Sequence, residues 1–101
     1  MVCCMIMSEN NTDIKLLRES VSIFNPDIIE VKPNYTNYLK AIQYLPDIII
    51  IALGVPCYDE LHFVQLVKQH KKAGHIPVIC YGDLLSETIT QALPAIGVDH
   101  F

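Results

Sequence analysis

The side chains that could do chemistry lie where apolar runs of the sequence end. Ser8 and Glu9 follow the apolar run at residues 2–7, and Asp83 follows the run at residues 77–81. If these runs are parallel strands, their carboxyl ends meet at one edge of a sheet, where Glu9 and Asp83 could hold a metal ion. Magnesium takes more oxygen ligands than two carboxylates supply, so we expect two solvated acids rather than a metal centre.

Two side chains, Cys57 and Ser8, are candidate nucleophiles. A reactive thiol needs a lowered pKa, and no Lys, Arg or His is adjacent to Cys57 in the sequence. The pattern supplies no general base for either residue. Cys3 and Cys4 are expected to fill the core or a sheet edge, since neighbouring strand residues point to opposite faces. The four histidines show no metal-ligand spacing with the cysteines. We therefore predict no enzyme activity and no cofactor.

The stretch PDIIIIALGVP, residues 46–56, contains four consecutive isoleucines. Such a run is typical of a strand buried on both faces, and strands of this kind usually deliver a functional side chain at their carboxyl end. This strand instead ends on Ala52, Leu53 and Gly54, none of which can ionise or bind a metal. The sequence predicts a strand placed for chemistry that carries no chemical group.

Apolar runs alternate with helical periods along the chain. The first helix is expected to begin at a cap on Asn11 or Thr12 and to end before Pro26. Its buried stripe should include Phe24, widened by Leu16, and Pro94 should end or kink the last helix. Strands are predicted at residues 2–7, 27–31, 48–53, 77–81 and 98–101, and helices at 12–24, 35–44, 58–72 and 86–94.

This alternation with short connections predicts a parallel sheet with helices on both faces. The expected fold class is α/β, a flavodoxin-like doubly wound parallel five-stranded sheet of order 2-1-3-4-5, formed by one domain over residues 1–101. The second, third and fourth helices should cover one face and the first helix the other. We expect the fifth helix of such a fold to be missing.

The pattern resembles the receiver domain of two-component response regulators. The resemblance rests on MSENNTDIKLL, PDIIIIALGVPCYDEL, HIPVICYGD and GVDHF, and it covers essentially the whole chain. In a receiver, the second stretch has Pro-Asp, four apolar residues, the phosphate-accepting Asp, three residues and then Pro. Here Pro46, Asp47 and Pro56 fall in place, which puts Ala52 at the acceptor position.

The resemblance implies roles for further positions. Receivers end the first strand with two adjacent metal-holding acids, and Ser8 and Glu9 match these positions. Gly82 stands where receivers have Ser or Thr after the fourth strand. Phe101 matches the aromatic packing switch on the fifth strand, and the sequence ends before the phosphate-binding Lys three residues further on.

Phosphoryl transfer to a receiver needs a carboxylate nucleophile, a cation held by oxygen ligands, and donors for the phosphoryl oxygens. Ala52, Ser8 and Gly82 each remove one of these, so we expect a degenerate phosphoacceptor pocket. The favoured function is a phosphorylation-independent pseudo-receiver, an interaction or regulatory module in signal transduction or transcription regulation. The alternative is a small-ligand-binding flavodoxin-like domain, although SENNTD lacks the glycines of a phosphate loop. An enzyme using Cys57 or Ser8 ranks last.

Charge and composition limit the partners. Seven basic and eleven acidic residues give a net charge of −4, which disfavours direct nucleic-acid binding. The basic residues at 68–72 are expected to complement the dipole of a helix end. MVCCMIMSEN has too few apolar residues for a membrane span or signal peptide, so we expect a cytoplasmic protein that does not bind a membrane. Without a fifth helix, part of the sheet would be bare, which predicts a protein partner or a homodimer.

Overall fold

The computed structural model describes residues 2–24, 26–32, 34–53, 58–82 and 87–101. The predictions that concern Gly54, Pro56, Cys57 and Asp83 lie outside these residues.

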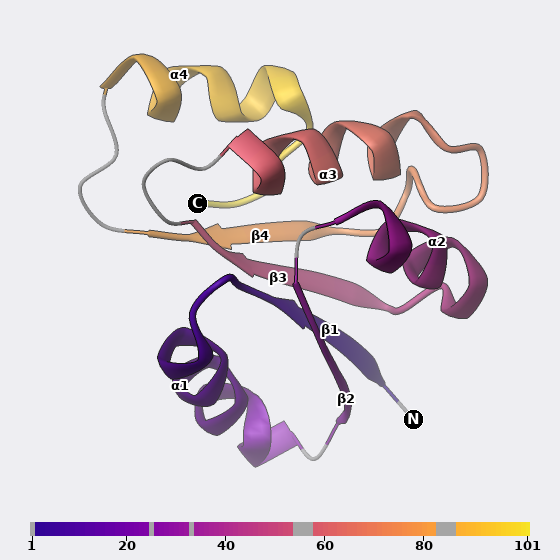
Figure 1. Ribbon diagram of the computed structural model, residues 1–101, viewed down its shortest axis with the longest axis vertical. Coiled ribbons are helices and arrows are strands. Elements are labelled where there is room, and N and C mark those ends of the chain that lie inside the picture. Colours follow the sequence, from indigo (N-terminus) through magenta and orange to yellow (C-terminus); the bar gives the residue numbers. More distant parts are fainter. Residues whose placement is uncertain (1, 25, 33, 54–57, 83–86) are drawn as a thin grey trace.

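Strands and helices alternate along the described chain, as expected (Figure 1). All strand pairs are parallel, and the four strands lie in the order β2-β1-β3-β4. The predicted flavodoxin-like α/β fold is confirmed. The elements are β1 Cys3–Met7, α1 Asn11–Val21, the 3₁₀ helix η1 Ser22–Phe24, β2 Asp27–Val31, α2 Tyr35–Tyr44, β3 Ile48–Ala52, α3 Tyr58–Gln69, β4 Val78–Tyr81 and α4 Glu87–Ile96.

The expected fifth strand is a single parallel bridge between Ile79 and His100. The Cys80 N–H donates to the His100 carbonyl at 2.8 Å, and the Asp99 N–H donates to the Val78 carbonyl at 2.9 Å. The final segment therefore lies beside β4, where the order 2-1-3-4-5 puts it, but it pairs over less length than a regular strand.

Helices α2, α3 and α4 cover one face of the sheet, and α1 lies on the other (Figure 1). Because successive strand residues point to opposite faces, this arrangement divides the core in two. The α1 side is built on Cys4, Ile6 and Ile14, with partly buried Leu17, Val21, Ile28, Ile48 and Ile50 packed against them. The larger core includes Met5, Met7, Ile49, Ile51, Phe63, Val64, Val67, Val78 and Leu93.

Two details of α1 differ from the sequence prediction. Asn10, not Asn11 or Thr12, caps the helix, and its side-chain oxygen accepts from the Thr12 N–H at 2.7 Å. Phe24 is 79% exposed because the chain changes to 3₁₀ geometry after Val21, which turns the following residues off the buried stripe. Leu16 is also exposed and does not widen that stripe.

Pro94 does not end α4, which continues to Ile96. The helix ends instead at Gly97, whose φ of 119° is open to glycine because it has no Cβ. Its N–H donates to the carbonyls of Leu93 and Pro94, both at 3.2 Å. Helix α3 is shorter than predicted and ends at Gln69.

Candidate functional site

The carboxyl ends of β1, β3 and β4 bring three of the candidate residues to one edge of the sheet. Met7 pairs in register with Ile51, and Ala52 pairs with Tyr81. Ser8 follows Met7, and Gly82 follows Tyr81. Three of the positions that the receiver resemblance singled out, Ser8, Ala52 and Gly82, therefore lie together.

Ser8 is a buried turn residue, with 2% of its surface exposed. Its hydroxyl accepts from the Asn10 N–H at 3.0 Å, and its own N–H donates to the Val31 carbonyl at 3.3 Å. Asn10 in turn caps α1. The Ser8 side chain is therefore part of the turn that starts the helix, a common use of a serine hydroxyl beside a helix N-terminus.

Ala52 and Gly82 make the carboxyl ends of β3 and β4 compact and uncharged. Ala52 is 3% exposed, and Leu53 beside it is also buried. A Cβ on Gly82 would lie 3.1 Å from the Leu53 carbonyl oxygen and 3.2 Å from the Leu53 Cβ. Such contacts are tighter than ordinary packing, so Gly82 allows β4 to leave the sheet close against Leu53. A serine or threonine here would require Leu53 to move.

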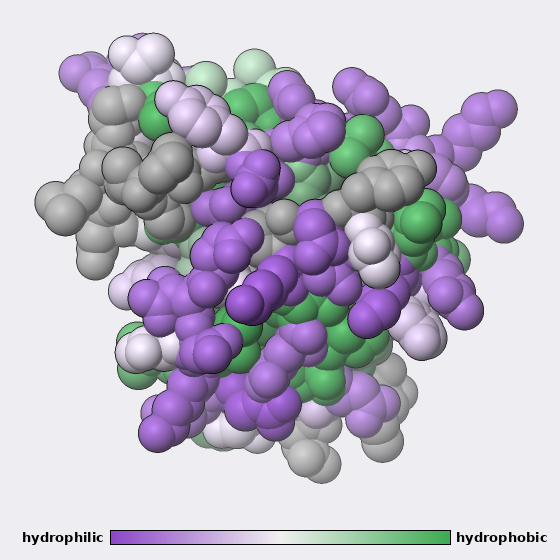
Figure 2. Space-filling view, viewed as in Figure 1, coloured by the Kyte–Doolittle hydropathy of each residue, from purple (hydrophilic) through white to green (hydrophobic). Residues whose placement is uncertain are grey.

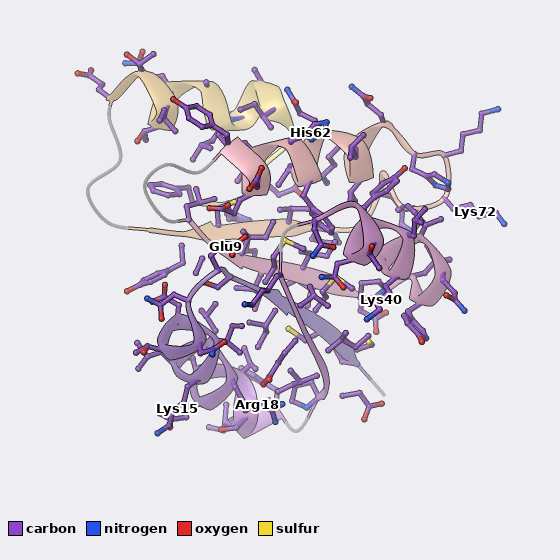
Figure 3. The ribbon with its side chains drawn as sticks, in the orientation of Figure 1. Glu9, Lys15, Arg18, Lys40, His62 and Lys72 are labelled. Carbon is purple, nitrogen blue, oxygen red and sulfur yellow. The ribbon has the colours of Figure 1, made fainter. Side chains whose placement is uncertain are left out.

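Glu9 is exposed in the turn before α1 (Figure 3). Among the described residues, no group of three or more His, Cys, Asp or Glu side chains lies close enough together to hold a metal ion. Asp83, the suggested partner of Glu9, lies outside the described chain. Phe101, at the position of the aromatic switch, is exposed, as is Tyr81 at the end of β4.

Sequence reasoning missed Glu60, a carboxylate in the first turn of α3 that is only 3% exposed. The signal was available, because Glu60 has the helical spacing of Phe63, Val64 and Val67, which form the buried side of this helix. A carboxylate in the first turn is also favoured by the helix dipole.

Lys68 lies in the last turn of α3, where the sequence predicted a cation that complements the helix dipole, and it also makes specific contacts. Its ammonium group donates to the Ile76 carbonyl and to Asp99, each at 2.8 Å, and its side chain is 17% exposed. The same Asp99 oxygen accepts from the Val78 N–H at 2.8 Å. These hydrogen bonds, from Lys68 first and then from Val78, lower the pKa of Asp99. The contact fastens the final segment to α3 and β4.

Cys4 packs in the core on the α1 side, as the sequence suggested, whereas Cys3 is only partly buried. Burial raises the pKa of Cys3, and the nearby charges of Asp27 and Asp47 raise it further. Burial, and secondarily Cys3, also raises the pKa of Cys4. Both thiols are therefore poorer nucleophiles than a free cysteine.

No described helix has the length and apolar character that crossing a membrane requires.

Comparison with solved structures gives the fold a clear class. The chain is similar to a response regulator from Hahella chejuensis, with a TM-score of 0.80 and 20% identity over 99% of this chain and 77% of the other. The chemotaxis response regulator CheY4 of Vibrio cholerae gives a TM-score of 0.83 and 15% identity over 99% and 83%. The receiver domain of a histidine kinase from Syntrophus aciditrophicus gives 0.77 and 21% over 100% and 76%.

No family model matches the sequence, and no curated protein matches it. At these levels of identity the likeness establishes the fold, which is the CheY-like fold of receiver domains. The residues at the strand ends must therefore carry any argument about function.

Proposed function

We propose that residues 1–101 form one degenerate receiver domain that acts as a phosphorylation-independent interaction or regulatory module in signal transduction or transcription regulation. The observation that carries the proposal is Ala52, a buried methyl group at the strand position where a receiver has its acceptor carboxylate. The neighbouring positions support it. Ser8 replaces one metal-holding acid and its hydroxyl binds the Asn10 N–H, and Gly82 replaces a hydroxyl-bearing residue.

Each of these differences removes a chemical group that phosphoryl transfer to a receiver requires. A methyl group cannot attack phosphorus, one carboxylate at Glu9 holds magnesium weakly, and glycine offers no donor to a phosphoryl oxygen. The same features weigh against a small-ligand site, because Ala52 and Gly82 supply no polar side chain at the strand ends. We therefore propose that the strand ends have no enzyme activity. We also propose that the domain acts in the cytoplasm by binding a protein partner.

Treatment with acetyl phosphate and magnesium, followed by intact-mass measurement, tests this proposal. A receiver that retains its acceptor aspartate is the positive control and should gain one phosphoryl group. The present chain should gain none. A stable phosphoryl adduct on this chain would refute the proposal, wherever the group was attached.

The proposal includes self-association as a homodimer through the α1 side of the sheet. Ile48, Ile50 and Ile79 are only partly buried on strands β3 and β4, whereas Ile49, Ile51 and Val78 are fully buried. A partly covered row of isoleucines favours pairing with a second copy. Light scattering at high concentration should give a dimer mass. A monomer mass without binding of an apolar dye would contradict it.

A further inference from the structure

Strand β2 forms an outer edge of the sheet, since among the described strands it pairs with β1 alone. The Asp27 N–H donates to the Val2 carbonyl at 2.8 Å, and the Val31 carbonyl accepts from the Ser8 N–H at 3.3 Å. Because backbone groups alternate in direction along a strand, those of Ile28 and Glu30 point away from the sheet. An edge of this kind can accept a further strand from another chain.

Shallow hollows follow β2 on both sides. One lies against α1 and is lined by residues that include Lys15, Arg18 and Glu30. A second runs from Glu30 past Lys32 to Lys40 on α2, and a third lies between Arg18 and Ile28. The strand edge is therefore bordered along its length by space that side chains of an added strand could occupy.

The charge of this edge is opposite to that of the rest of the chain. The side chains that line the hollows include four basic and two acidic residues, and the exposed Asp27 at the start of β2 brings the balance of the edge to +1. The remaining residues have three basic and eight acidic, a balance of −5. One acid, Glu30, is paired with Arg18. The six residues are Lys15, Arg18, Lys32, Lys40, Glu19 and Glu30.

The figures show how these charges border the strand. Lys15 and Arg18 lie on α1, and Lys40 lies on α2, on either side of β2 (Figure 3). The face that contains this edge is largely hydrophilic, with a small apolar area between the polar side chains (Figure 2). A strand added to β2 would therefore meet cations from both neighbouring helices.

We propose that the β2 edge binds an extended acidic segment of a partner protein as an added β-strand. Charge selects this occupant. A second copy paired through the same edge would bring two basic borders together. A nucleic acid is a long polyanion that would extend past this edge onto the acidic remainder of the chain, whereas a short acidic strand meets the edge alone. Charged edges also prevent unspecific strand pairing, but a border with an excess of cations disfavours basic and like edges while still accepting an acidic strand.

This inference rests on the proposed function in one respect, because both assign the chain a protein partner. Their tests are separate: acetyl-phosphate labelling concerns the strand ends alone, and peptide binding concerns β2 alone. Phosphorylation of the chain would leave the inference about the edge standing, and failure of peptide binding would leave the degenerate pocket standing.

The probe is a capped heptapeptide that alternates threonine and glutamate, titrated into the ¹⁵N-labelled chain. We expect amide shifts centred on Ile28 and Glu30 and binding that weakens as salt is added. A heptapeptide that alternates threonine and lysine should not bind. A glutamate peptide N-methylated on alternate amides should bind about tenfold more weakly or worse, because it cannot complete the strand hydrogen bonds.

Matched variants separate charge from backbone. Lys15→Glu with Lys40→Glu should weaken peptide binding by about tenfold, whereas Lys71→Glu with Lys72→Glu, an equal change of charge beyond α3, should change it less than about twofold. Glu30→Ala and Glu30→Pro both remove the carboxylate, but only proline removes the outward N–H. The alanine variant should bind at least as well as the parent, and the proline variant should not bind.

Amide spectra of β1 and β3 show whether each variant is folded, and the N-methylated peptide tests the backbone on the unmodified chain.

Three results would overturn the proposal. They are shifts absent from Ile28 and Glu30, equal binding of the lysine peptide, and binding of a single-stranded oligonucleotide where the acidic peptide fails.

Discussion

Ser8, Ala52 and Gly82, at the carboxyl ends of β1, β3 and β4, are small and uncharged, whereas the residues that border β2 include long, charged and exposed side chains on α1 and α2. At the strand ends, Ala52 and Ser8 are almost fully covered, and Gly82 lies against Leu53. Along β2, the paired side chains of Arg18 and Glu30 are 51% and 35% exposed. Ser8 and Ala52 are packed like core residues, and the exposed charges lie beside β2.

This difference indicates that stability and recognition are separated in the molecule. Buried residues contribute to the free energy of unfolding through packing, and changes to them are costly. Exposed charges contribute little to stability but much to the choice of partner. Substitutions at the strand ends should therefore change unfolding, and substitutions along β2 should change binding.

The largest effect is expected from Ala52→Asp. The new carboxylate would occupy a buried position where, among the described residues at the strand ends, Glu9 alone could share a cation, so we expect a loss of about 2–4 kcal/mol in the free energy of unfolding. Ala52→Asn, nearly the same in shape but neutral, should lose less. Urea unfolding of both variants at pH 7 measures the difference.

The same variant tests the loss of switching. Beryllofluoride and magnesium should leave the amide spectrum around Tyr81 and Phe101 of Ala52→Asp unchanged, because Gly82 offers no hydroxyl to a bound fluoride. A beryllofluoride-dependent shift at those residues would show that one carboxylate is enough to restore a receiver, and the strand ends would then not be inert.

The fold was predictable because its signals are local and repeated. The isoleucine run at β3 and the helical spacing of Ile14, Leu17 and Val21 each indicate an element, and short connections leave few topologies. The errors occur where geometry changes within an element. Phe24 has helical spacing but follows a change to 3₁₀ geometry, and Gly97, rather than Pro94, ends α4.

The site was predictable in part. The spacing of Pro46 and Asp47 placed Ala52 at a strand end, and the structure brings it beside Ser8 and Gly82. The close approach of Gly82 to Leu53, and the contacts of Asp99, depend on segments that are remote in the sequence, so no local pattern predicts them. The charge of the β2 edge is also hidden in the sequence, because its lysines come from α1, from α2 and from the residue that follows β2.

An intermediate effect is expected at Asp99. Unlike the ion pair of Arg18, the ion pair of Asp99 with Lys68 is reinforced by a hydrogen bond from the backbone N–H of Val78 to the same carboxylate. Asp99→Ala removes acceptors for Lys68 and for the Val78 N–H, and should cost about 1–2 kcal/mol of unfolding free energy. Asp99→Asn should recover part of this loss by accepting from Val78. Chemical unfolding measures both.

The contribution of Asp99 should depend on pH. Its pKa is lower in the folded chain than the ordinary value of 3.8, so its stabilisation is complete above that value and is lost as the pH falls through the folded pKa. The groups that face it are Lys68 and His100. The stability difference between the parent and Asp99→Asn should narrow below about pH 4. A constant difference would contradict the ionic contribution.

A smaller effect is expected at Gly82, where the cost comes from a Cβ rather than from a polar group. Gly82→Ala and Gly82→Ser both place a Cβ near the Leu53 carbonyl, so each should lose about 1 kcal/mol in thermal or urea unfolding. The two variants should agree closely. If serine were the more stable, its hydroxyl would have found a partner at the strand ends, and the strand ends would not be inert.

The smallest effect on stability is expected at Arg18, and it should coincide with a clear effect on binding. The ion pair between Arg18 and Glu30 is exposed, so Arg18→Ala should change the free energy of unfolding by less than about 0.5 kcal/mol. The same change removes a cation from two of the hollows beside β2, and should weaken binding of the threonine–glutamate peptide about threefold to fivefold. Lys72→Ala is the control, and it should alter neither quantity. A large loss of stability with unchanged peptide binding would mean that Arg18 serves the fold, and the separation between packed strand ends and a recognising edge would fail at this residue.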